Sequence, residues 1–347
     1  MTDTADRLPL ELAIASVSSG NSLTRSQAAA ALAVIMAGEA SDEQISALLL
    51  GLKEKGETVD ELAGLAQTMR SLATGVKPTR ERLLDTCGTG GGRRTFNIST
   101  TAALIAAAAG CAVAKHGNRT ATGLSGSADV LEALGAKLEL SPHAEAQLID
   151  EIGFGFMFAP AHHSATRYVV PVRKALAVPT VFNLLGPLTN PAGARRQLIG
   201  VADPALIDLV AGALAELGTD HALVVSSEDG LDEISTSGTT HVAELQGTEM
   251  RRYEISPQQF GIEPAAADEL SGGGPDENAQ VINSIFAGVA GPQRDIAVLN
   301  AAAAIYLGGE SQSIEEGIAV AGAAIDSGAA AATLERYLNR SVELAAQ

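Results

Sequence analysis

The stretch that decides the fold reads Asp85-Thr-Cys-Gly-Thr-Gly-Gly-Gly-Arg-Arg-Thr-Phe-Asn-Ile-Ser-Thr100. The apolar pair at 83–84 precedes it, and an Ala-rich helical pattern follows it. Glycines let a backbone approach an anion closely, and a helix start adds N–H donors and positive potential. A Gly-rich turn alone is a weak signal, but its place between a strand and a helix start favours a phosphate-binding loop.

The alternation of strands and helices continues beyond this loop. Short apolar segments at 112–114 and 223–225 end in polar, Gly- or Ser-rich stretches and alternate with Ala-rich helices. This pattern predicts an α/β domain over residues 76–347 with a mostly parallel central sheet. Binding sites in such sheets lie beyond the carboxyl ends of the strands. The stretch 292–345 predicts further helices.

Residues 1–75 predict a small helical domain hinged to the α/β domain. Three capping boxes mark helix starts in it: Thr24-x-x-Gln27, Ser41-x-x-Gln44 and Thr58-x-x-Glu61. Gly38 and Gly56 stand where C-terminal caps are expected. The segment 160–180 again reads as helical, and we expect it to join this domain.

The composition limits the possible partners. A net charge of −18 over 347 residues repels phosphate polymers, so we expect no nucleic-acid partner. The sequence predicts no signal peptide and no membrane contact, since its apolar runs are short and broken by glycine. The only two cysteines, Cys87 and Cys111, have no metal-ligand spacing, which indicates a reducing, cytoplasmic location.

A second cluster of polar residues follows the buried segment at 112–114. It reads Lys115-His-Gly-Asn-Arg119, with Ser125-Gly-Ser-Ala-Asp129 shortly after. Lysine and arginine add phosphate-pairing charge, and arginine can bind two oxygens at once. His116 taken alone is better explained as a hydrogen-bonded loop histidine, but the cluster as a whole does not fit a core.

A third motif, Glu228-Asp-Gly-Leu-Asp232-Glu233, follows the segment at 223–225. Adjacent carboxylates at the end of a strand suit Mg²⁺, which also takes substrate phosphate oxygens. A solvated acidic loop is the ordinary alternative for this motif alone.

A fourth motif places Arg173 before Phe182-Asn-Leu-Leu-Gly-Pro-Leu-Thr-Asn-Pro191. We expect the run at 186–191 to form a rigid loop. Arg173 is either a surface charge or the group that binds the carboxylate of a small acid substrate.

In this order the motifs resemble those of anthranilate phosphoribosyltransferases. The resemblance covers roughly residues 40–335, and its most specific parts are KHGNR with GSADVLEALG, and FNLLGPLTNP. It implies a helical domain hinged to an α/β domain, a fold shared with pyrimidine nucleoside phosphorylases, and a homodimer. It also implies a reaction in tryptophan biosynthesis, in which the anthranilate amine displaces pyrophosphate from PRPP with two Mg²⁺ ions bound.

The resemblance assigns site residues by position. Those implied to bind PRPP are Gly88, Gly91, Gly92, Thr95, Asn97, Ile98, Ser99, Thr100, Lys115, His116, Gly117, Asn118, Arg119, Thr120, Ala121, Thr122, Gly123 and Ser127. Those implied to bind anthranilate are Gly88, Asn118 and Arg173, with His116 and Pro187 lining its path. The implied Mg²⁺ ligands are Ser99, Asp232 and Glu233. No general acid or base is assigned, because the aromatic amine is already neutral at pH 7.

The first loop departs from the family pattern. The family continues GTGG with Asp and Gly, whereas this chain continues directly with Gly92-Arg93-Arg94 and is one residue shorter. Two cations thus stand where one anion is missing, and we expect Arg93 and Arg94 to contact pyrophosphate.

Three other functions stay open on the sequence. They are a transferase for another aromatic acid or amine, a pyrimidine nucleoside phosphorylase, and a non-catalytic relative that binds nucleic acid. Asn118 and Arg173 favour an acceptor with a carboxylate. The Asp232-Glu233 pair fits Mg-PRPP better than free phosphate, and the net charge of −18 argues against nucleic acid.

Overall fold

The N-terminal helices begin at the predicted capping boxes. A computed structural model describes residues 4–120 and 123–347. The hydroxyls of Thr24, Ser41 and Thr58 each accept the N–H of the residue three positions on, whose side chain returns the bond. Gly56, with φ +86°, caps the third helix, which confirms these helix ends. The four helices are α1 (Thr4–Ser18), α2 (Arg25–Met36), α3 (Asp42–Lys55) and α4 (Val59–Leu72).

The strands within the described residues form one seven-stranded sheet in the order β3-β2-β1-β4-β5-β6-β7. Their bounds are β1 (Leu84–Gly88), β2 (Val113–Gly117), β3 (Phe154–Phe158), β4 (Arg196–Gly200), β5 (His221–Ser227), β6 (Thr240–Gln246) and β7 (Glu249–Ile255). Neighbours from β3 to β5 pair in parallel, whereas β6 and β7 pair antiparallel. The structure thus confirms an α/β domain with a mostly parallel sheet.

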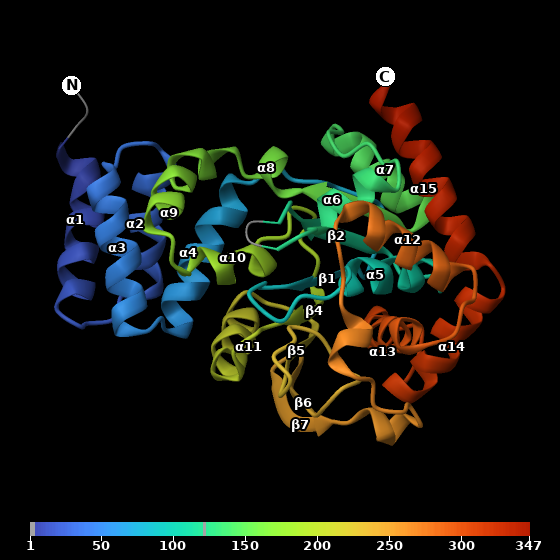
Figure 1. The fold of residues 1–347 in the computed structure, drawn as a ribbon. Helices are drawn as coiled ribbons and strands as arrows, with labels where there is room; N and C mark the ends of the chain where they lie inside the picture. Colours follow the sequence, from blue (N-terminus) through green and yellow to red (C-terminus); the bar gives the residue numbers. More distant parts are fainter. Residues whose placement is uncertain (1–3, 121–122) are drawn as a thin grey trace.

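Helices cover both faces of this sheet (Figure 1). Helices α5 and α13 pack on one face, and α11 packs between the other face and α4. The remaining bounds are α5 (Ile98–Ala108), α6 (Ser127–Ala133), α7 (Pro142–Ile152), α8 (Ala159–His162), α9 (Val170–Leu176), α10 (Phe182–Leu188), α11 (Ile207–Glu216), α12 (Pro275–Phe286), α13 (Pro292–Gly308), α14 (Ile314–Asp326) and α15 (Ala329–Ala345).

The sheet contributes side chains to two separate cores. Leu198 and Leu223 belong to the core formed with α5 and α13. Ile199 and Val224, their neighbours along β4 and β5, belong to the core formed with α1–α4 and α10. Side chains alternate between the two faces of a strand, so one face of the sheet belongs to the core with α5 and α13 and the other face to the core with the N-terminal helices.

The segment after β3 returns to the N-terminal helices. It forms α8, a 3₁₀ turn (Ser164–Tyr168) and α9, and Val172 of α9 is buried in the same core as α1–α4. The Tyr168 ring covers Gly38 so closely that a Cβ there would lie 2.6 Å from the Tyr168 Cζ atom.

The expectation of a loop throughout residues 186–191 is wrong. Helix α10 runs through Gly186 and Pro187 to Leu188. The buried side chains Phe182, Leu184, Leu185 and Leu188 give the segment a helical apolar face, which outweighs the backbone donor missing at Pro187. The helix ends one residue after the proline.

The described residues contain no single helix that is both long and apolar enough to cross a membrane. Helices α14 and α15 reach that length and hydropathy only when taken together, across a bend of 66°.

Candidate functional site

Two loops meet at the carboxyl edge of the parallel strands. The glycine loop, residues 88–97, follows β1, and the acidic loop, residues 228–233, follows β5. The Gly90 N–H donates to Asp232 Oδ2 at 2.9 Å. A Cβ at Gly92 would lie only 2.9 Å from Asp232 Oδ1, and a Cβ at Gly88 would overlap the same carboxylate. Glycine is therefore required here partly because the two loops touch.

The three predicted Mg²⁺ ligands lie where the acidic loop meets the start of α5. The Ser99 N–H, at the start of α5, donates to Glu233 Oε1 at 3.1 Å. Burial and the neighbouring Asp232 carboxylate raise the pKa of Glu233 to about 8, and burial also raises the pKa of Asp232. A buried carboxylate pair whose charge is disfavoured in this way is stabilised by a divalent cation.

The donor set fits magnesium better than zinc. The described residues contain no group of three or more His, Cys, Asp or Glu side chains placed to hold a metal. Two carboxylates and a hydroxyl supply too few ligands for a closed zinc site. They suit Mg²⁺, which keeps waters and takes substrate phosphate oxygens.

Lys115 and His116 lie inside β2, not in the loop after it as the sequence predicted. Lys115 is buried, and its Nζ donates to the Thr86 carbonyl oxygen and, at 3.3 Å, to Ser99 Oγ. Burial lowers the Lys115 pKa, while the carboxylates of Asp85 and Glu233 oppose that shift. Lys115 thus contacts one of the predicted metal ligands, Ser99, through its side chain.

His116 faces the other side of the strand. Its Nδ1 atom lies 3.1 Å from the Gly186 carbonyl oxygen, which can only accept, so Nδ1 carries the proton. Burial lowers the pKa of His116 to about 3, aided by the adjacent His163, whose ring centroid is 5.1 Å away. The Nε2 atom of this neutral ring is a buried acceptor without a partner among the described residues.

Arg173, in α9, lies against α10. Its Nη2 donates to Asn183 Oδ1 at 3.1 Å, and its guanidinium lies 5.4 Å from the Phe182 ring centroid. Its Nε is buried and finds no partner in the part of the chain that the structure describes. Helix α10 therefore contacts both Arg173 and His116, two residues implied to meet the acceptor.

Arg119 is held by carboxylates, although the sequence predicted a phosphate partner. Its Nη1 lies 3.2 Å from Asp129 Oδ1 and also pairs with Glu132. Asn118 Oδ1 accepts the Arg119 N–H at 2.7 Å, and Ser127 Oγ donates to the Asn118 carbonyl at 3.3 Å. The loop after β2 is thus tied to the start of α6.

The remaining predicted PRPP residues have the following places. Thr120 donates its N–H to Asp129 Oδ2 at 3.0 Å and accepts the Gly123 N–H at 2.7 Å, while Ala121 and Thr122 lie outside the described residues. A Cβ at Gly117 would overlap Ser127 Oγ, and Gly91 is exposed with φ +87°. Ile98 is buried in the core, and the Thr95 backbone lies against Gly272. Thr100 Oγ1 is buried and has no hydrogen-bond partner among the described residues.

Two asparagines that the sequence reasoning missed position the loops. Asn300, fully buried in α13, accepts the Ile234 N–H at 2.9 Å and donates to the Ile234 carbonyl at 2.8 Å. Asn278 donates to Asn97 Oδ1 at 2.9 Å. A lone polar residue inside the otherwise apolar pattern of α13 was the available signal for the first.

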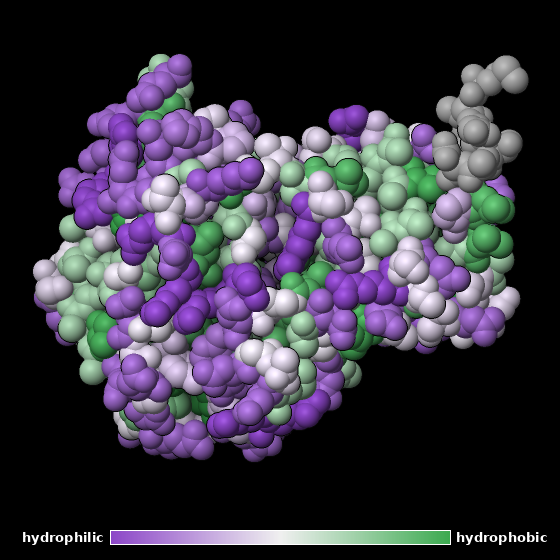
Figure 2. All heavy atoms as spheres, turned by 180° about the vertical axis from the view of Figure 1, so that it is seen from behind, coloured by the Kyte–Doolittle hydropathy of each residue, from purple (hydrophilic) through white to green (hydrophobic). Residues whose placement is uncertain are grey.

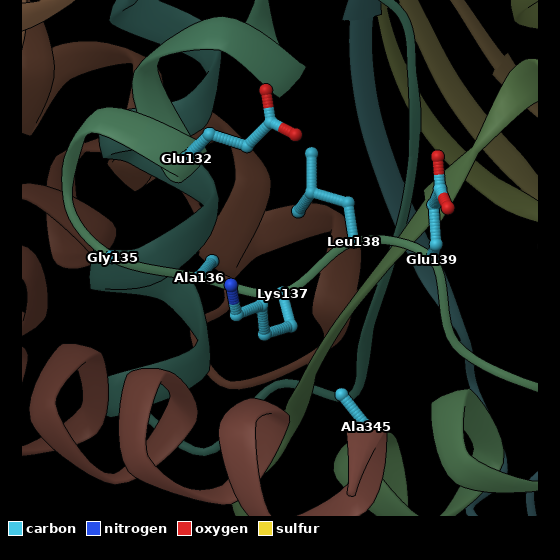
Figure 3. A pocket seen from close by; sticks show the side chains of 7 residues that line it. All are labelled: Glu132, Gly135, Ala136, Lys137, Leu138, Glu139 and Ala345. Carbon is cyan, nitrogen blue, oxygen red and sulfur yellow. The ribbon is translucent and has the colours of Figure 1, made fainter.

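A hollow of about 370 Å³ lies apart from this site (Figure 3). Its lining residues are Glu132, Gly135, Ala136, Lys137, Leu138, Glu139 and Ala345. None of the predicted site residues lines it, so we place the functional site at the loops, where the ionisable groups converge.

Comparisons with known proteins identify the family of this chain. Residues 80–331 match the glycosyl transferase family a/b domain, and residues 12–73 match the helical bundle domain of the same family. The anthranilate phosphoribosyltransferase of Rubrobacter xylanophilus is 50% identical over 97% of this chain and 98% of its own length.

Solved structures give the same result. The anthranilate phosphoribosyltransferase of Thermus thermophilus is 43% identical, with a TM-score of 0.90 over 95% of this chain and 99% of that one. The Saccharomyces cerevisiae enzyme in complex with PRPP and Mg is 27% identical, with a TM-score of 0.88 over 96% and 98% of the two chains. This chain therefore belongs to the anthranilate phosphoribosyltransferase family.

Proposed function

We propose that this protein transfers the phosphoribosyl group of PRPP to the amine of anthranilate. The products are N-(5-phosphoribosyl)anthranilate and pyrophosphate, and the reaction belongs to tryptophan biosynthesis. The observation that carries the proposal is the meeting of the glycine loop with Asp232 and Glu233, beside Ser99 and Lys115.

This arrangement suits loss of pyrophosphate from ribose. Breaking the C1–O bond leaves an oxocarbenium-like ribose and places new charge on the leaving group. The fixed Lys115 cation and the N–H donors at the start of α5 would stabilise that charge. Asp232, Glu233 and Ser99 would hold Mg²⁺, which supplies further charge neutralisation when bound; two ions are the family expectation.

The acceptor would be bound through its carboxylate, and no side chain of the enzyme would remove a proton from its amine. Arg173, with its unpaired Nε, would bind the carboxylate, while Asn118 and Gly88 would border the acceptor. His116 would offer its Nε2 as a hydrogen-bond acceptor to the amine. With a pKa of about 3 it is too weak a base to remove a proton at neutral pH, so we assign no general base.

A panel of substrates separates this function from the alternatives. Anthranilate fluorescence should fall only when PRPP and Mg²⁺ are both present. Consumption of another aromatic acid in preference to anthranilate would favour a related transferase, and phosphorolysis of thymidine or uridine would favour a nucleoside phosphorylase. Binding of duplex DNA or RNA without any turnover would favour the non-catalytic function.

We also propose the domain limits and the assembly. Residues 1–75 together with 160–180 would form the helical domain, and 76–347 the α/β domain. A homodimer through the helical domain is supported by the exposed Leu8 and Leu12 of α1, which border a shallow groove of about 290 Å³ against α2. Apolar groups also gather at this end of the molecule in Figure 2.

The dimer can be tested by light scattering during size exclusion. The wild type should elute at twice the chain mass, and Leu12→Glu should lower that mass. Leu72→Glu, a matched change at the exposed end of α4, should not. A wild-type monomer at micromolar concentration would refute the proposed homodimer.

We also propose that the protein acts in the reducing cytoplasm, which the free thiols of Cys87 and Cys111 support.

A further inference from the structure

Arg93, in the shortened part of the glycine loop, is anchored twice to the acidic loop. Its backbone N–H donates to the Gly230 carbonyl at 2.9 Å, and its Nη1 lies 3.2 Å from Asp229 Oδ2. Ser235 Oγ donates to that same carboxylate oxygen at 2.8 Å and fixes its position. The guanidinium is therefore held in place against the acidic loop, which also carries the predicted metal ligands Asp232 and Glu233.

The other two nitrogens of this guanidinium are unused. Arg93 Nε and Nη2 are shielded from solvent and have no hydrogen-bond partner within residues 4–120 and 123–347. Their N–H groups point the same way along one edge of the guanidinium plane. This is an edge with which arginine binds two oxygens of a phosphate at once. Unpaired buried donors on a cation are costly, so the arrangement indicates a bound anion.

We propose that Arg93 binds the diphosphate group of PRPP, and the released pyrophosphate, through Nε and Nη2 while Nη1 stays on Asp229. The inference rests on the proposed function, since it takes PRPP as the substrate. Arginine alone suits this double role, because a lysine ammonium cannot present two parallel donors and hold a carboxylate in the same plane.

The diphosphate end of PRPP is favoured over the 5′-phosphate by the neighbours of Arg93. The preceding residue, Gly92, lies against the Asp232 carboxylate. Mg²⁺ held by such carboxylates takes phosphate oxygens of the substrate, which brings the diphosphate to these loops. The diphosphate also gains charge as the C1–O bond breaks, so a fixed cation here stabilises the leaving group.

The structure separates Arg93 from its neighbour Arg94. The Arg94 side chain is exposed, whereas Arg93 is half-buried between the two loops. The proposal therefore concerns Arg93 alone, although from the sequence we expected both arginines to contact pyrophosphate.

Calorimetric titration of the full-length protein tests the proposal. Inorganic pyrophosphate with Mg²⁺ and PRPP with Mg²⁺ are the two probes, each used without anthranilate. Arg93→Lys keeps the charge and removes the two-donor edge, so both affinities should fall by roughly 10- to 100-fold. The KM for PRPP should rise while the KM for anthranilate stays within about twofold. Arg252→Lys, which alters an exposed ion pair with Asp208, should bind both probes like the wild type.

Several outcomes would overturn this role of Arg93. They are wild-type protein that does not bind pyrophosphate, Arg93→Lys protein that binds it normally, and a loss for PRPP without a loss for pyrophosphate. A loss that Asp229→Asn reproduces in full would assign the effect to loop structure instead. If wild-type protein binds pyrophosphate but consumes no anthranilate, the proposed function fails and the Arg93 site stands.

Discussion

Asp232 fills the space that a side chain at Gly88 would need. A Cβ on Gly88 would lie 2.9 Å from Asp232 Cγ and would overlap its Oδ2, the oxygen that accepts the Gly90 N–H. The end of β1 and the acidic loop after β5 are therefore fitted to each other, and the predicted metal ligand depends on the absence of a side chain two strands away in the sheet.

Gly88→Ala should displace Asp232 and lower kcat/KM for PRPP by at least about 100-fold, because a catalytic group moved by about 1 Å loses that much. The comparison is Gly322→Ala in α14, where a Cβ would meet nothing within 4 Å. That variant should be as active as the wild type and slightly more stable, since alanine favours a helix. Steady-state kinetics on both proteins test this prediction. Normal PRPP kinetics in Gly88→Ala would show that the position of Asp232 does not depend on a glycine at residue 88.

Asp232→Asn and Glu233→Gln should each lower kcat by about 100-fold or more, because they remove the charges that would hold Mg²⁺. Raising the Mg²⁺ concentration should partly restore the activity of each. Glu228→Gln, an exposed change in the same acidic loop, is the control and should leave the Mg²⁺ dependence unaltered. If either carboxamide variant were as active as the wild type at every Mg²⁺ concentration, the substituted residue would not be a metal ligand.

Arg173→Lys should raise the KM for anthranilate by roughly 10- to 100-fold and leave the KM for PRPP nearly unchanged. A guanidinium can bind a carboxylate through two parallel hydrogen bonds, which a lysine ammonium cannot reproduce. Lys174→Met, on the neighbouring exposed position of α9, should have kinetics like the wild type. An equal rise in both KM values would instead indicate that Arg173 supports the fold of α10 through Asn183.

Much of the fold could be predicted because its signals are local. The capping boxes at Thr24, Ser41 and Thr58 act within one turn of helix, and the structure confirms each of them. The alternation of apolar segments with Ala-rich helices likewise identified the parallel sheet. Local rules failed at Pro187, where buried leucines on one face kept a helix that the proline argued against.

The site was less predictable because its contacts are long-range. Lys115 and His116 read as loop residues, yet both lie inside a buried strand, where the Thr86 carbonyl bonds Lys115 Nζ and the Gly186 carbonyl bonds His116 Nδ1. Arg119 pairs with Glu132, thirteen residues later, and Asn300 in the C-terminal helices bonds Ile234, directly after the acidic loop. No spacing in the sequence encodes which distant groups will meet.

Asn300→Ala should destabilise the protein by about 3 kcal/mol, because it leaves both the N–H and the carbonyl of Ile234 without their partner in a buried position. Asn300→Asp keeps the acceptor and loses the donor. It should also destabilise the protein, because it places a carboxylate charge in a buried position. Urea unfolding gives both values. An Asn300→Ala protein as stable as the wild type would show that Asn300 does not anchor the acidic loop.

His116 should make the protein less stable in acid. Its folded pKa of about 3 lies below the ordinary value of about 6.5, so at pH above 6.5 the ring is neutral in both states. As the pH falls from 6.5 towards 3, only the unfolded state takes up the proton, at a cost of about 1.4 kcal/mol per pH unit. The unfolding free energy of the wild type, relative to His116→Gln, should therefore fall by about 2 kcal/mol between pH 7 and pH 5. A difference that does not change with pH would contradict the buried, neutral ring.

We propose that one site couples the consumption of anthranilate to the release of pyrophosphate from PRPP. The most direct measurement follows anthranilate fluorescence and released pyrophosphate in the same reaction of the wild-type protein. We predict equal molar amounts of anthranilate consumed and pyrophosphate formed, with neither change when PRPP or Mg²⁺ is left out. No loss of fluorescence at high protein concentration, or pyrophosphate release that does not depend on anthranilate, would contradict the account.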